Sequence, residues 1–457
     1  MLTVREIKRI TKGVLVQGKI SSAVTGVSID SRKIKRGNVF IAVKGARFDG
    51  HDFIRGATRN GATTVIVSRK IACSKDITVI RVADTTTALG QIAAWHRNQF
   101  RIPVIAITGS TGKTTAKEMI ASVLGKQFNI LKNVGTQNNQ YGVPLTLLKL
   151  NSSHQAAVLE LGTNQPGDIR WLAKITRPTI SIFTNIGESH LERLKSPVGV
   201  FLEKARLIKY MEPDGTIIAN GDDRYLANLS RKHKRYKIIR FGCSGNVDYR
   251  ASHINVLNNR CLYFKVKRHV FKINTSAIHN VYNALAAISC GLVCKIRYND
   301  IITALNCFRF SGGRQEIKKI GRLWLIDDTY NANPMSLKSA ISTLDTLQIK
   351  GKRIVICADM LELGPRSVAL HRSAGEMIGR SNTDVVLTIG RYARYITQGL
   401  NQSKGGIKAL HCRDLGEVRR RLKWICCRGD AVLVKGSRGM HMERVVAFLN
   451  TSFRKSS

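Results

Sequence analysis

Short apolar runs alternate with longer segments of mixed polarity along most of this chain. In the middle of the sequence the runs are rich in β-branched and aliphatic residues, and they lie at 103–108, 156–160, 180–184 and 216–219. Strand-length runs separated by helix-length segments are typical of an α/β fold with a mostly parallel sheet. We therefore predict a central α/β domain over residues 101–312, with a β-rich insertion or edge at 247–273.

The same pattern predicts one domain on each side of the central one. Residues 1–100 contain short strand-like runs at 39–43 and 63–67, with a helical segment at 51–60 between them. They predict a small α/β domain. After the glycine pair Gly312-Gly313 the alternation resumes, with apolar runs at 323–327, 353–357, 384–389 and 431–434. We predict a second doubly wound, Rossmann-like sheet for residues 313–457.

Length and composition agree with three soluble domains. The 457 residues correspond to about three domains of ordinary size, and no apolar run reaches the ~18 residues of a membrane span. The first ten residues lack the apolar segment of a secretory signal, so we expect a cytoplasmic protein. None of the ten cysteines stands in a C-x-x-C pair, so we expect reduced thiols and no structural metal.

The charge is unusual, with 74 Lys and Arg against 30 Asp and Glu, a formal net charge of +44. A nucleic-acid partner is one interpretation. The other is a generally basic solvated surface, helped by anionic substrates. The cations are spread over the whole chain, and the densest run, 231–237, is short and has no accompanying nucleic-acid motif. Net charge alone indicates non-specific association and not a specific site. We therefore expect no specific nucleic-acid partner.

The strongest local motif lies at 104–115. The strand-like run Val104–Thr108 leads into Gly109-Ser-Thr-Gly112, and Lys113-Thr114-Thr115 begins a helical segment. A strand, a glycine turn and a helix N-terminus form an anion site, because backbone N–H groups and the helix dipole converge there. The usual phosphate loop has a further glycine where this chain has Ile107. The alternative is an ordinary strand-to-helix turn with a surface lysine.

Two other groups of polar residues are candidates for the same chemistry. Polar loops follow three of the central strands, so Glu160, Asn185 and His190 are expected to gather near the glycine loop. In the first domain, Asp30-Ser31-Arg32 and Lys44 lie in turn-rich surroundings where they could hold a phosphate. The alternative is that both segments are ordinary turns exposed to solvent.

The ordered set of motifs resembles the Mur ligase family, whose members form amide bonds through ATP-driven acyl phosphates. The short loop 108–115 is the family's phosphate loop, which accounts for Ile107. The other matching segments are 138–144, 160–162, 185–190, the segment around Lys204, 279–283 and 313–314. Residues 30–32, 40–51, 327–334, 359–364 with His371, and 434–438 resemble the F-type members. Ala358 and Arg206 depart from the family pattern, Arg206 by placing a cation where an acidic residue often follows the lysine.

The resemblance implies a ligase that uses ATP to join D-alanyl-D-alanine to UDP-N-acetylmuramoyl-tripeptide. It implies that residues 1–100 bind the UDP substrate, 101–312 bind ATP, and 313–457 bind the dipeptide, in a monomer whose third domain closes over the site. An E-type Mur ligase or folylpolyglutamate synthetase is the rival within this chemistry. A basic nucleic-acid-binding ATPase is the rival from another class.

The resemblance also implies roles for individual residues. Lys113, His190 and Lys204 are the implied catalytic group. ATP would be held by Gly109, Ser110, Thr111, Gly112, Lys113, Thr114, Thr115, Asn283, Arg314, Asp328 and Tyr330. Two Mg²⁺ ions would be held by Thr114, Glu160, His190 and Lys204, the last as a carbamate formed with CO₂. The two substrates would contact Ser31, Arg32, Lys44, Asn139, Asn331, Asn333, Lys435, Ser437 and Arg438. For the asparagines, formation of a turn is the alternative.

Overall fold

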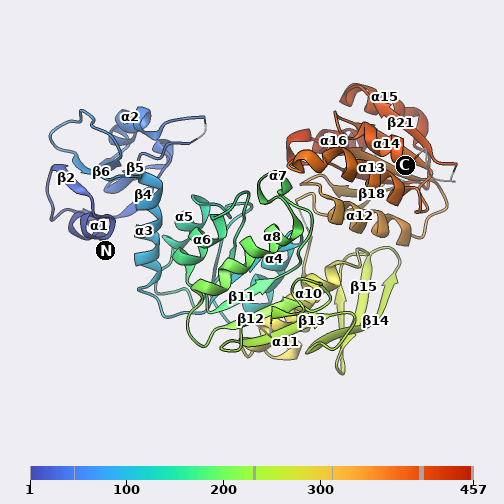
Figure 1. Ribbon diagram of the computed structural model, residues 1–457, viewed down its shortest axis with the longest axis horizontal. Coiled ribbons are helices and arrows are strands. Elements are labelled where there is room, and N and C mark those ends of the chain that lie inside the picture. Colours follow the sequence, from blue (N-terminus) through green and yellow to red (C-terminus); the bar gives the residue numbers. More distant parts are fainter. Residues whose placement is uncertain (1, 46, 230–232, 311, 401–405, 454–457) are drawn as a thin grey trace.

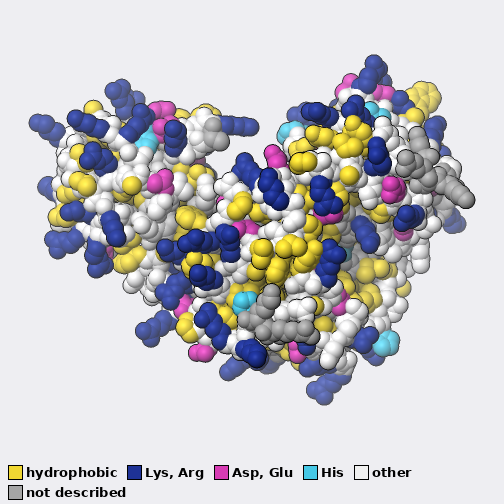
Figure 2. Space-filling view, viewed as in Figure 1, with side chains coloured by type: hydrophobic (Ala, Val, Ile, Leu, Met, Phe, Trp, Pro, Cys, Tyr) yellow, Lys and Arg dark blue, Asp and Glu magenta, His cyan; other side chains and the backbone are white. Residues whose placement is uncertain are grey.

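The computed structural model describes residues 2–45, 47–229, 233–310, 312–400 and 406–453. Three α/β domains follow one another along an arc, with the central domain between the N-terminal and C-terminal ones (Figure 1). The surface is hollowed between the two outer domains (Figure 2). Within the described ranges, no helix is long and apolar enough to cross a membrane. Arg231 and Lys232 of the basic run at 231–237 lie outside the described residues.

The N-terminal domain is a five-stranded sheet with strand order β2-β7-β6-β5-β4. The strands are β2 (Val14–Gln17), β4 (Gly26–Ser28), β5 (Asn38–Ile41), β6 (Ala62–Val67) and β7 (Thr78–Arg81), and the helices are α1 (Val4–Thr11), α2 (Ile54–Arg59) and α3 (Thr85–Arg97). Strands β5 and β6 and helix α2 confirm the elements predicted at 39–43, 63–67 and 51–60. Asp84 caps α3 by accepting the N–H of Thr87.

Helix α3 connects the N-terminal domain to the central one. The buried guanidinium of Arg97 donates from Nε to the carbonyl of Thr176 (2.8 Å) and from Nη2 to that of Arg177 (3.0 Å). These are terminal carbonyls of α6 (Asp168–Thr176), which have no partner within their own helix. Gly90 of α3 lies against Trp171 of α6, where an added Cβ would be 2.6 Å from the ring.

The central domain is a nine-stranded sheet with strand order β16-β15-β14-β13-β12-β11-β8-β10-β9. Its parallel strands are β8 (Val104–Thr108), β9 (Ile130–Lys132), β10 (Ala156–Glu160), β11 (Ile180–Phe183), β12 (Thr216–Asn220) and β13 (Lys237–Gly242). The predicted β-rich segment at 247–273 extends this sheet as β14 (Tyr249–Leu257), β15 (Cys261–Val266) and β16 (His269–Ile273). The helices are α4 (Lys113–Leu124), α5 (Gly142–Leu147), α6, α7 (Leu191–Leu194), α8 (Pro197–Ala205), α10 (Asn280–Val293) and α11 (Tyr298–Cys307).

The C-terminal domain is a six-stranded sheet with strand order β17-β18-β22-β19-β20-β21, parallel except for the β17–β18 pair. The strands are β17 (Glu316–Ile320), β18 (Leu323–Asp328), β19 (Arg353–Ala358), β20 (Val385–Ile389), β21 (Lys408–Cys412) and β22 (Ala431–Lys435). The helices are α12 (Pro334–Thr346), α13 (Ser367–Ile378), α14 (Arg394–Leu400), α15 (Leu415–Ile425) and α16 (Glu443–Phe453). These two large sheets confirm the predicted α/β fold class.

The position of β8 determines where the polar loops meet. This strand is buried along its whole length and lies between β11 and β10, both parallel to it. Ile107 is paired with Glu160 of β10, and Thr108 is paired with Phe183 of β11. The carboxyl ends of three parallel strands therefore lie side by side, and the loops that follow them open on the same edge of the sheet.

Specific polar contacts join the central and C-terminal domains at two separate places. In the β14–β15 turn, Asn259 donates from Nδ2 to the carbonyl of Gln348, and its Oδ1 accepts the N–H of Gln348, both at 2.8 Å. Near α7, His190 Nδ1 lies 2.5 Å from Glu362 Oε2, and Arg366 lies 3.4 Å from Glu188. Two separated attachments restrict both the distance and the orientation between the domains.

We predict that Asn259→Ala weakens the attachment at the β14–β15 turn. Losing both hydrogen bonds exposes the Gln348 amide, so its hydrogen exchange should become at least about tenfold faster. Asn258→Ala is the matched control, because Asn258 is exposed and has a φ of 53° against 56° for Asn259. Hydrogen exchange measured by mass spectrometry over residues 340–352 tests this, and equal rates in the two variants would contradict it.

Candidate active site

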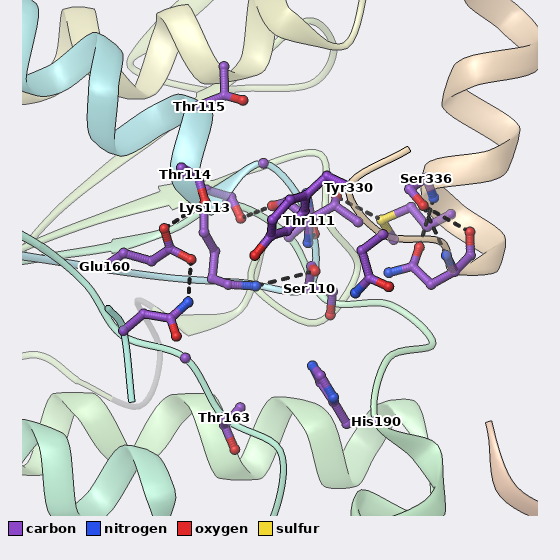
Figure 3. Close-up of a pocket in the computed structure, with 18 of the residues that line it drawn as sticks. Ser110, Thr111, Lys113, Thr114, Thr115, Glu160, Thr163, His190, Tyr330 and Ser336 are labelled. Carbon is purple, nitrogen blue, oxygen red and sulfur yellow. Dashed lines mark hydrogen bonds between the residues drawn. The ribbon is translucent and has the colours of Figure 1, made fainter. Parts of the chain in front are cut away.

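A cavity of about 710 Å³ opens where the central strands end, and residues of the C-terminal domain complete its wall. Sixteen of the residues predicted for the site line it: Ser110, Thr111, Gly112, Lys113, Thr114, Thr115, Asn139, Glu160, His190, Asn283, Arg314, Asp328, Tyr330, Asn331, Asn333 and Lys435. The close-up shows Lys113 and Thr114 facing Glu160, with Thr115 directed away from them (Figure 3). The structure therefore brings the phosphate loop and the polar ends of β10 and β18 to one space.

The phosphate loop has a shape that glycine makes possible. Gly112 has a φ of +78°, in the left-handed region, and serves as the N-cap of α4. An added Cβ there would lie 2.6 Å from Asn283 Oδ1 on α10. At Gly109, an added Cβ would lie 1.9 Å from Thr184 Oγ1. Both positions need glycine because the neighbouring elements approach the loop backbone closely.

Hydrogen bonds from the end of β11 hold the same loop. Asn185 Oδ1 accepts the N–H of Thr111 (2.8 Å), and the carbonyl of Asn185 accepts the N–H of Ser110 (2.9 Å). Thr184 Oγ1 donates to the carbonyl of Thr111 at 2.6 Å. The predicted proximity of Asn185 to the glycine loop is thus confirmed, and its role in this structure is to fix the loop.

Lys113 is folded over the loop that precedes it. Its Nζ donates to the carbonyls of Gly109 (2.8 Å) and Ser110 (3.4 Å). Burial lowers the pKa of Lys113, and the charge of Arg314 lowers it further, whereas Glu160 opposes both effects. A lysine in these surroundings gains most from an anion that replaces the loop carbonyls as its partner.

Thr114 and Glu160 form a pair of oxygen donors at the start of α4. Thr114 Oγ1 donates to Glu160 Oε2 at 2.7 Å, and Asn138 Nδ2 donates to Oε1 at the same distance. Glu160 is 2% exposed. Asn138 is therefore the member of the Asn138-Asn139 pair that reaches the carboxylate. Asn139 Oδ1 instead accepts the N–H groups of Tyr141 and Gly142, which is the turn-forming alternative.

A hydroxyl beside a carboxylate suits a hard cation such as Mg²⁺, which binds through few protein oxygens together with phosphate oxygens and water. No cluster of three or more His, Cys, Asp or Glu suited to a metal occurs in the described part of the chain. His190 lines the cavity, on the opposite side of the phosphate loop from Thr115 (Figure 3). Its Nδ1 is bound to Glu362 of the C-terminal domain rather than grouped with Glu160. The oxygen pair of Thr114 and Glu160 is thus separate from the His190 imidazole.

Lys204 lies on α8 behind the cavity and is 1% exposed. Burial holds the pKa of Lys204 well below its ordinary value; Lys113 lowers it further, whereas Glu203 and Glu160 oppose the shift. Arg206 pairs with Glu203 at 3.4 Å and its side chain is 45% exposed, so this unusual cation is directed toward solvent. Lys204 is therefore a buried amine disposed toward its neutral form.

The C-terminal wall of the cavity presents paired and unpaired cations. The Arg314 guanidinium stacks at 3.6 Å over the Tyr330 ring, and its buried Nη2 has no hydrogen-bond partner among the described residues. Lys435 Nζ donates to Asp328 Oδ2 (2.5 Å) and to the carbonyl of Asn331 (2.9 Å). Burial raises the pKa of Asp328, and Lys435 opposes the shift. Arg314 is thus available to an anion, whereas Lys435 is already neutralised.

Several predicted residues are placed elsewhere or have structural partners. Ser31, Arg32, Lys44, Lys204, Ser437 and Arg438 do not line the cavity. Arg32 forms an exposed ion pair with Asp30 (2.9 Å), and buried Ser437 Oγ accepts the N–H of Leu361 (2.8 Å). Asn333 caps α12 by accepting the N–H of Ser336. Of these residues, Asn333 still lines the cavity, and Lys204 lies close enough to Lys113 and Glu160 for their charges to interact; Ser31, Arg32, Lys44, Ser437 and Arg438 are not brought to the phosphate loop.

His279 is a cavity residue that the sequence interpretation did not include among the site residues. Its Nδ1 is buried without a hydrogen-bond partner in the described chain. Burial and the charge of Lys435 lower the pKa of His279 to about 4, so the ring is neutral at physiological pH. His279 stands four residues before Asn283 in the motif 279–283, and that position in the motif is the sequence signal for it.

Comparisons with protein families agree with these three domains. The description "Mur ligase family, catalytic domain" matches residues 23–97, "Mur ligase middle domain" matches 107–291, and "Mur ligase, glutamate ligase domain" matches 313–438. Together the three matches cover most of the chain, and the middle one contains the phosphate loop and Lys204.

Similarity to individual proteins extends over the full length. The chain is 35% identical to UDP-N-acetylmuramoyl-tripeptide--D-alanyl-D-alanine ligase of Bacillus subtilis, over 97% of each chain. Its structure is similar to MurF from Acinetobacter baumannii, with a TM-score of 0.91 and 31% identity over 98% of this chain and 99% of that one. MurF ligase from Thermotoga maritima in complex with ADP gives a TM-score of 0.85 and 28% identity, covering 94% and 98%. This chain therefore belongs to the Mur ligase family.

Proposed function

We propose that this protein joins D-alanyl-D-alanine to UDP-N-acetylmuramoyl-tripeptide with ATP, giving the pentapeptide, ADP and phosphate in peptidoglycan precursor synthesis. The observation that carries the proposal is the single cavity shared by the phosphate loop and the C-terminal residues Arg314 and Asp328. A carboxylate of the tripeptide attacks the γ-phosphorus, and the amine of the dipeptide then displaces phosphate from the acyl phosphate. The names of the full-length relatives support this choice of substrates.

The phosphate loop would hold the β- and γ-phosphates, and both reaction steps develop negative charge on oxygens there. Lys113 exchanges its loop carbonyls for phosphate oxygens, and Arg314 adds a cation from the other domain. Asn283, Asp328 and Tyr330 would contact adenine and ribose. Asn139, Asn331, Asn333 and Lys435, with Ser31, Arg32, Lys44, Ser437 and Arg438, remain candidate substrate contacts.

Thr114 and Glu160 would hold Mg²⁺, which when bound would neutralise charge on the phosphoryl oxygens. The oxygen pair at 2.7 Å supports this assignment. We assign a second Mg²⁺ to His190, since imidazole is a common metal ligand, together with Lys204 as a carbamate. In carbamate formation the neutral amine of Lys204 attacks CO₂, a C–N bond forms, and one amine proton is released. The lowered pKa of Lys204 supports the reaction, because only the neutral amine is nucleophilic.

The domain roles belong to the same proposal. Residues 1–100 bind the UDP part, 101–312 bind ATP, and 313–457 bind the dipeptide, in a cytoplasmic monomer. Either diaminopimelate or lysine at the third peptide position is compatible with this assignment.

The reaction itself gives the first prediction for this site. ADP should be released only when UDP-N-acetylmuramoyl-tripeptide and D-alanyl-D-alanine are both present, because the acyl phosphate needs an amine to turn over. A coupled assay of ADP release, with pentapeptide identified by mass spectrometry, measures this. Controls replace the dipeptide with diaminopimelate or lysine, or add DNA or RNA. ATP turnover that responds to nucleic acid and not to the two substrates would refute the proposal.

We predict that Gly112→Ala weakens ADP binding at least about tenfold, because the loop must shift away from Asn283 and strain of this kind costs roughly 1–3 kcal/mol. Gly245→Ala is the matched control. Its φ is +66°, and no atom lies within 4 Å of an added Cβ. Isothermal titration calorimetry with ADP compares the variants. Equal affinities would show that the loop adapts without cost.

We predict that Lys204→Met raises the thermal unfolding midpoint at pH 7, in buffer free of CO₂, by about 3 °C. The pKa of Lys204 is lowered on folding, so the unfolded chain binds more protons between the folded pKa and the ordinary value. The native protein therefore gains stability as pH rises through that window, and the advantage of methionine should shrink toward pH 10. Lys209→Met, at an exposed position, is the control. An advantage independent of pH would contradict the prediction.

A further inference from the structure

Trp424 is an exposed aromatic residue that the proposed ligase reaction does not use. It lies in the last turn of α15, and it is 89% exposed, more than any other large apolar side chain in the described chain. Val418 and Leu422 of the same helix are buried in the core of the C-terminal domain. The packing of α15 therefore does not require Trp424, and its meaning depends on the side chains around it.

Exposed cations surround Trp424 because three turns meet at the amino ends of the C-terminal strands. The N–H of Gly429 donates to the carbonyl of Arg322 (2.9 Å), and the N–H of Gly351 donates to that of Gly429 (3.2 Å). These contacts bring together the turns before β18, β19 and β22. We call the resulting surface the basic rim; it consists of Arg322, Lys350, Lys352, Lys423, Trp424 and Arg428, all of them exposed.

The carboxylate within these turns does not neutralise the basic rim. Asp430 is 1% exposed, and its two oxygens accept the N–H groups of Lys352 and Cys427, both at 2.7 Å. The cations thus face solvent, while the acid is used to tie the turns together. Figure 1 places α15 at the outer end of the C-terminal domain, and Figure 2 shows Lys and Arg side chains projecting there.

The basic rim lies at the opposite end of the strands from the cavity. Strand β18 begins next to Arg322 and ends at Asp328, and parallel β22 ends at Lys435. Six residues of strand span about 20 Å. A partner bound at the rim would therefore leave the cavity open to its substrates.

We propose that the basic rim docks on an anionic lipid surface, with Trp424 inserted at the level of the headgroups. Tryptophan is favoured at this depth, and Lys and Arg around it attract acidic lipids. A nucleic-acid site would more typically place its aromatic residue in a groove, partly covered, whereas Trp424 projects. A second copy would bring two basic surfaces together, which charge repulsion disfavours. This inference is independent of the proposed ligase reaction.

Vesicle binding by the full-length protein tests the proposal. Co-sedimentation should show binding to phosphatidylcholine vesicles only when phosphatidylglycerol is included, with quenching of tryptophan fluorescence by lipids brominated near the headgroup. Trp424→Ala should lower the partition coefficient about tenfold, as expected if on the order of 60 Å² of apolar surface leaves the membrane. Arg322→Ala with Lys352→Ala should lower it about 30-fold. Ligase activity on soluble substrates should be unchanged in both variants.

Matched variants elsewhere separate the basic rim from the general charge of the chain. Phe48→Ala removes another exposed aromatic side chain, 71% exposed, in the N-terminal domain. Lys265→Ala with Arg268→Ala removes two exposed cations from the central domain. Neither variant should reduce vesicle binding more than twofold, because side chains that do not lie at the membrane surface contribute little to the attraction. Equal losses in the control and rim variants would overturn the proposal.

Two other outcomes would also overturn it. Binding of single-stranded DNA that Trp424→Ala abolishes, with no binding to phosphatidylglycerol vesicles, would assign the rim to nucleic acid. A dimer seen by analytical ultracentrifugation, converted to monomer by Trp424→Ala, would assign it to a second copy. Binding to vesicles regardless of their charge would also refute the electrostatic part of the proposal.

Discussion

The hydrogen bonds between the end of β11 and the phosphate loop are the constraint on which the rest of the site depends. Thr184 and Asn185 fix both backbone groups of Thr111, one by a hydroxyl and one by an amide. The loop is consequently held in position before any ligand arrives, so ligand binding need not supply the ordering of its backbone. Asn283 of α10 also approaches the loop closely, at Gly112. A loop held between two elements keeps its N–H groups directed to one place.

The same arrangement explains how Lys113 and Lys204 can lie close together in a protein interior. Burial lowers the pKa of both lysines, the charge of Lys113 lowers the pKa of Lys204 further, and Glu160 opposes the shift at both. Glu203, next to Lys204, is committed to the start of α6, where it accepts the N–H groups of Gly167 and Ile169. The Glu203 carboxylate therefore stabilises the start of α6 and only partly offsets the charge of the lysines. A bound phosphate, or a carbamate on Lys204, would supply further negative charge beside the two buried lysines.

The fold and the centre of the site could be predicted from sequence because both depend on local patterns. The run Val104–Thr108 and the following glycines specify strand, turn and helix within twelve residues, and Glu160 follows its own strand. Asn138 was missed because two adjacent asparagines give no information on which side chain turns inward. Ser437 does not line the cavity, because its hydroxyl accepts the N–H of Leu361, a contact between distant segments that no local pattern encodes. The contact between His190 and Glu362 depends on how two domains meet, which no local pattern encodes.

The large excess of positive charge leaves the buried site intact because acidic residues are retained where the fold uses them. Asp359 accepts the N–H groups of Tyr392 and Ala393, Asp430 links the turns before β19 and β22, and Glu160 and Asp328 lie in the cavity wall. All four are at most 6% exposed. Replacing any of them would leave buried N–H groups or cations without a partner, which costs more than an exposed charge change. Surface cations carry no such penalty, so a net charge of +44 can accumulate at the surface while the chemistry of the cavity stays the same.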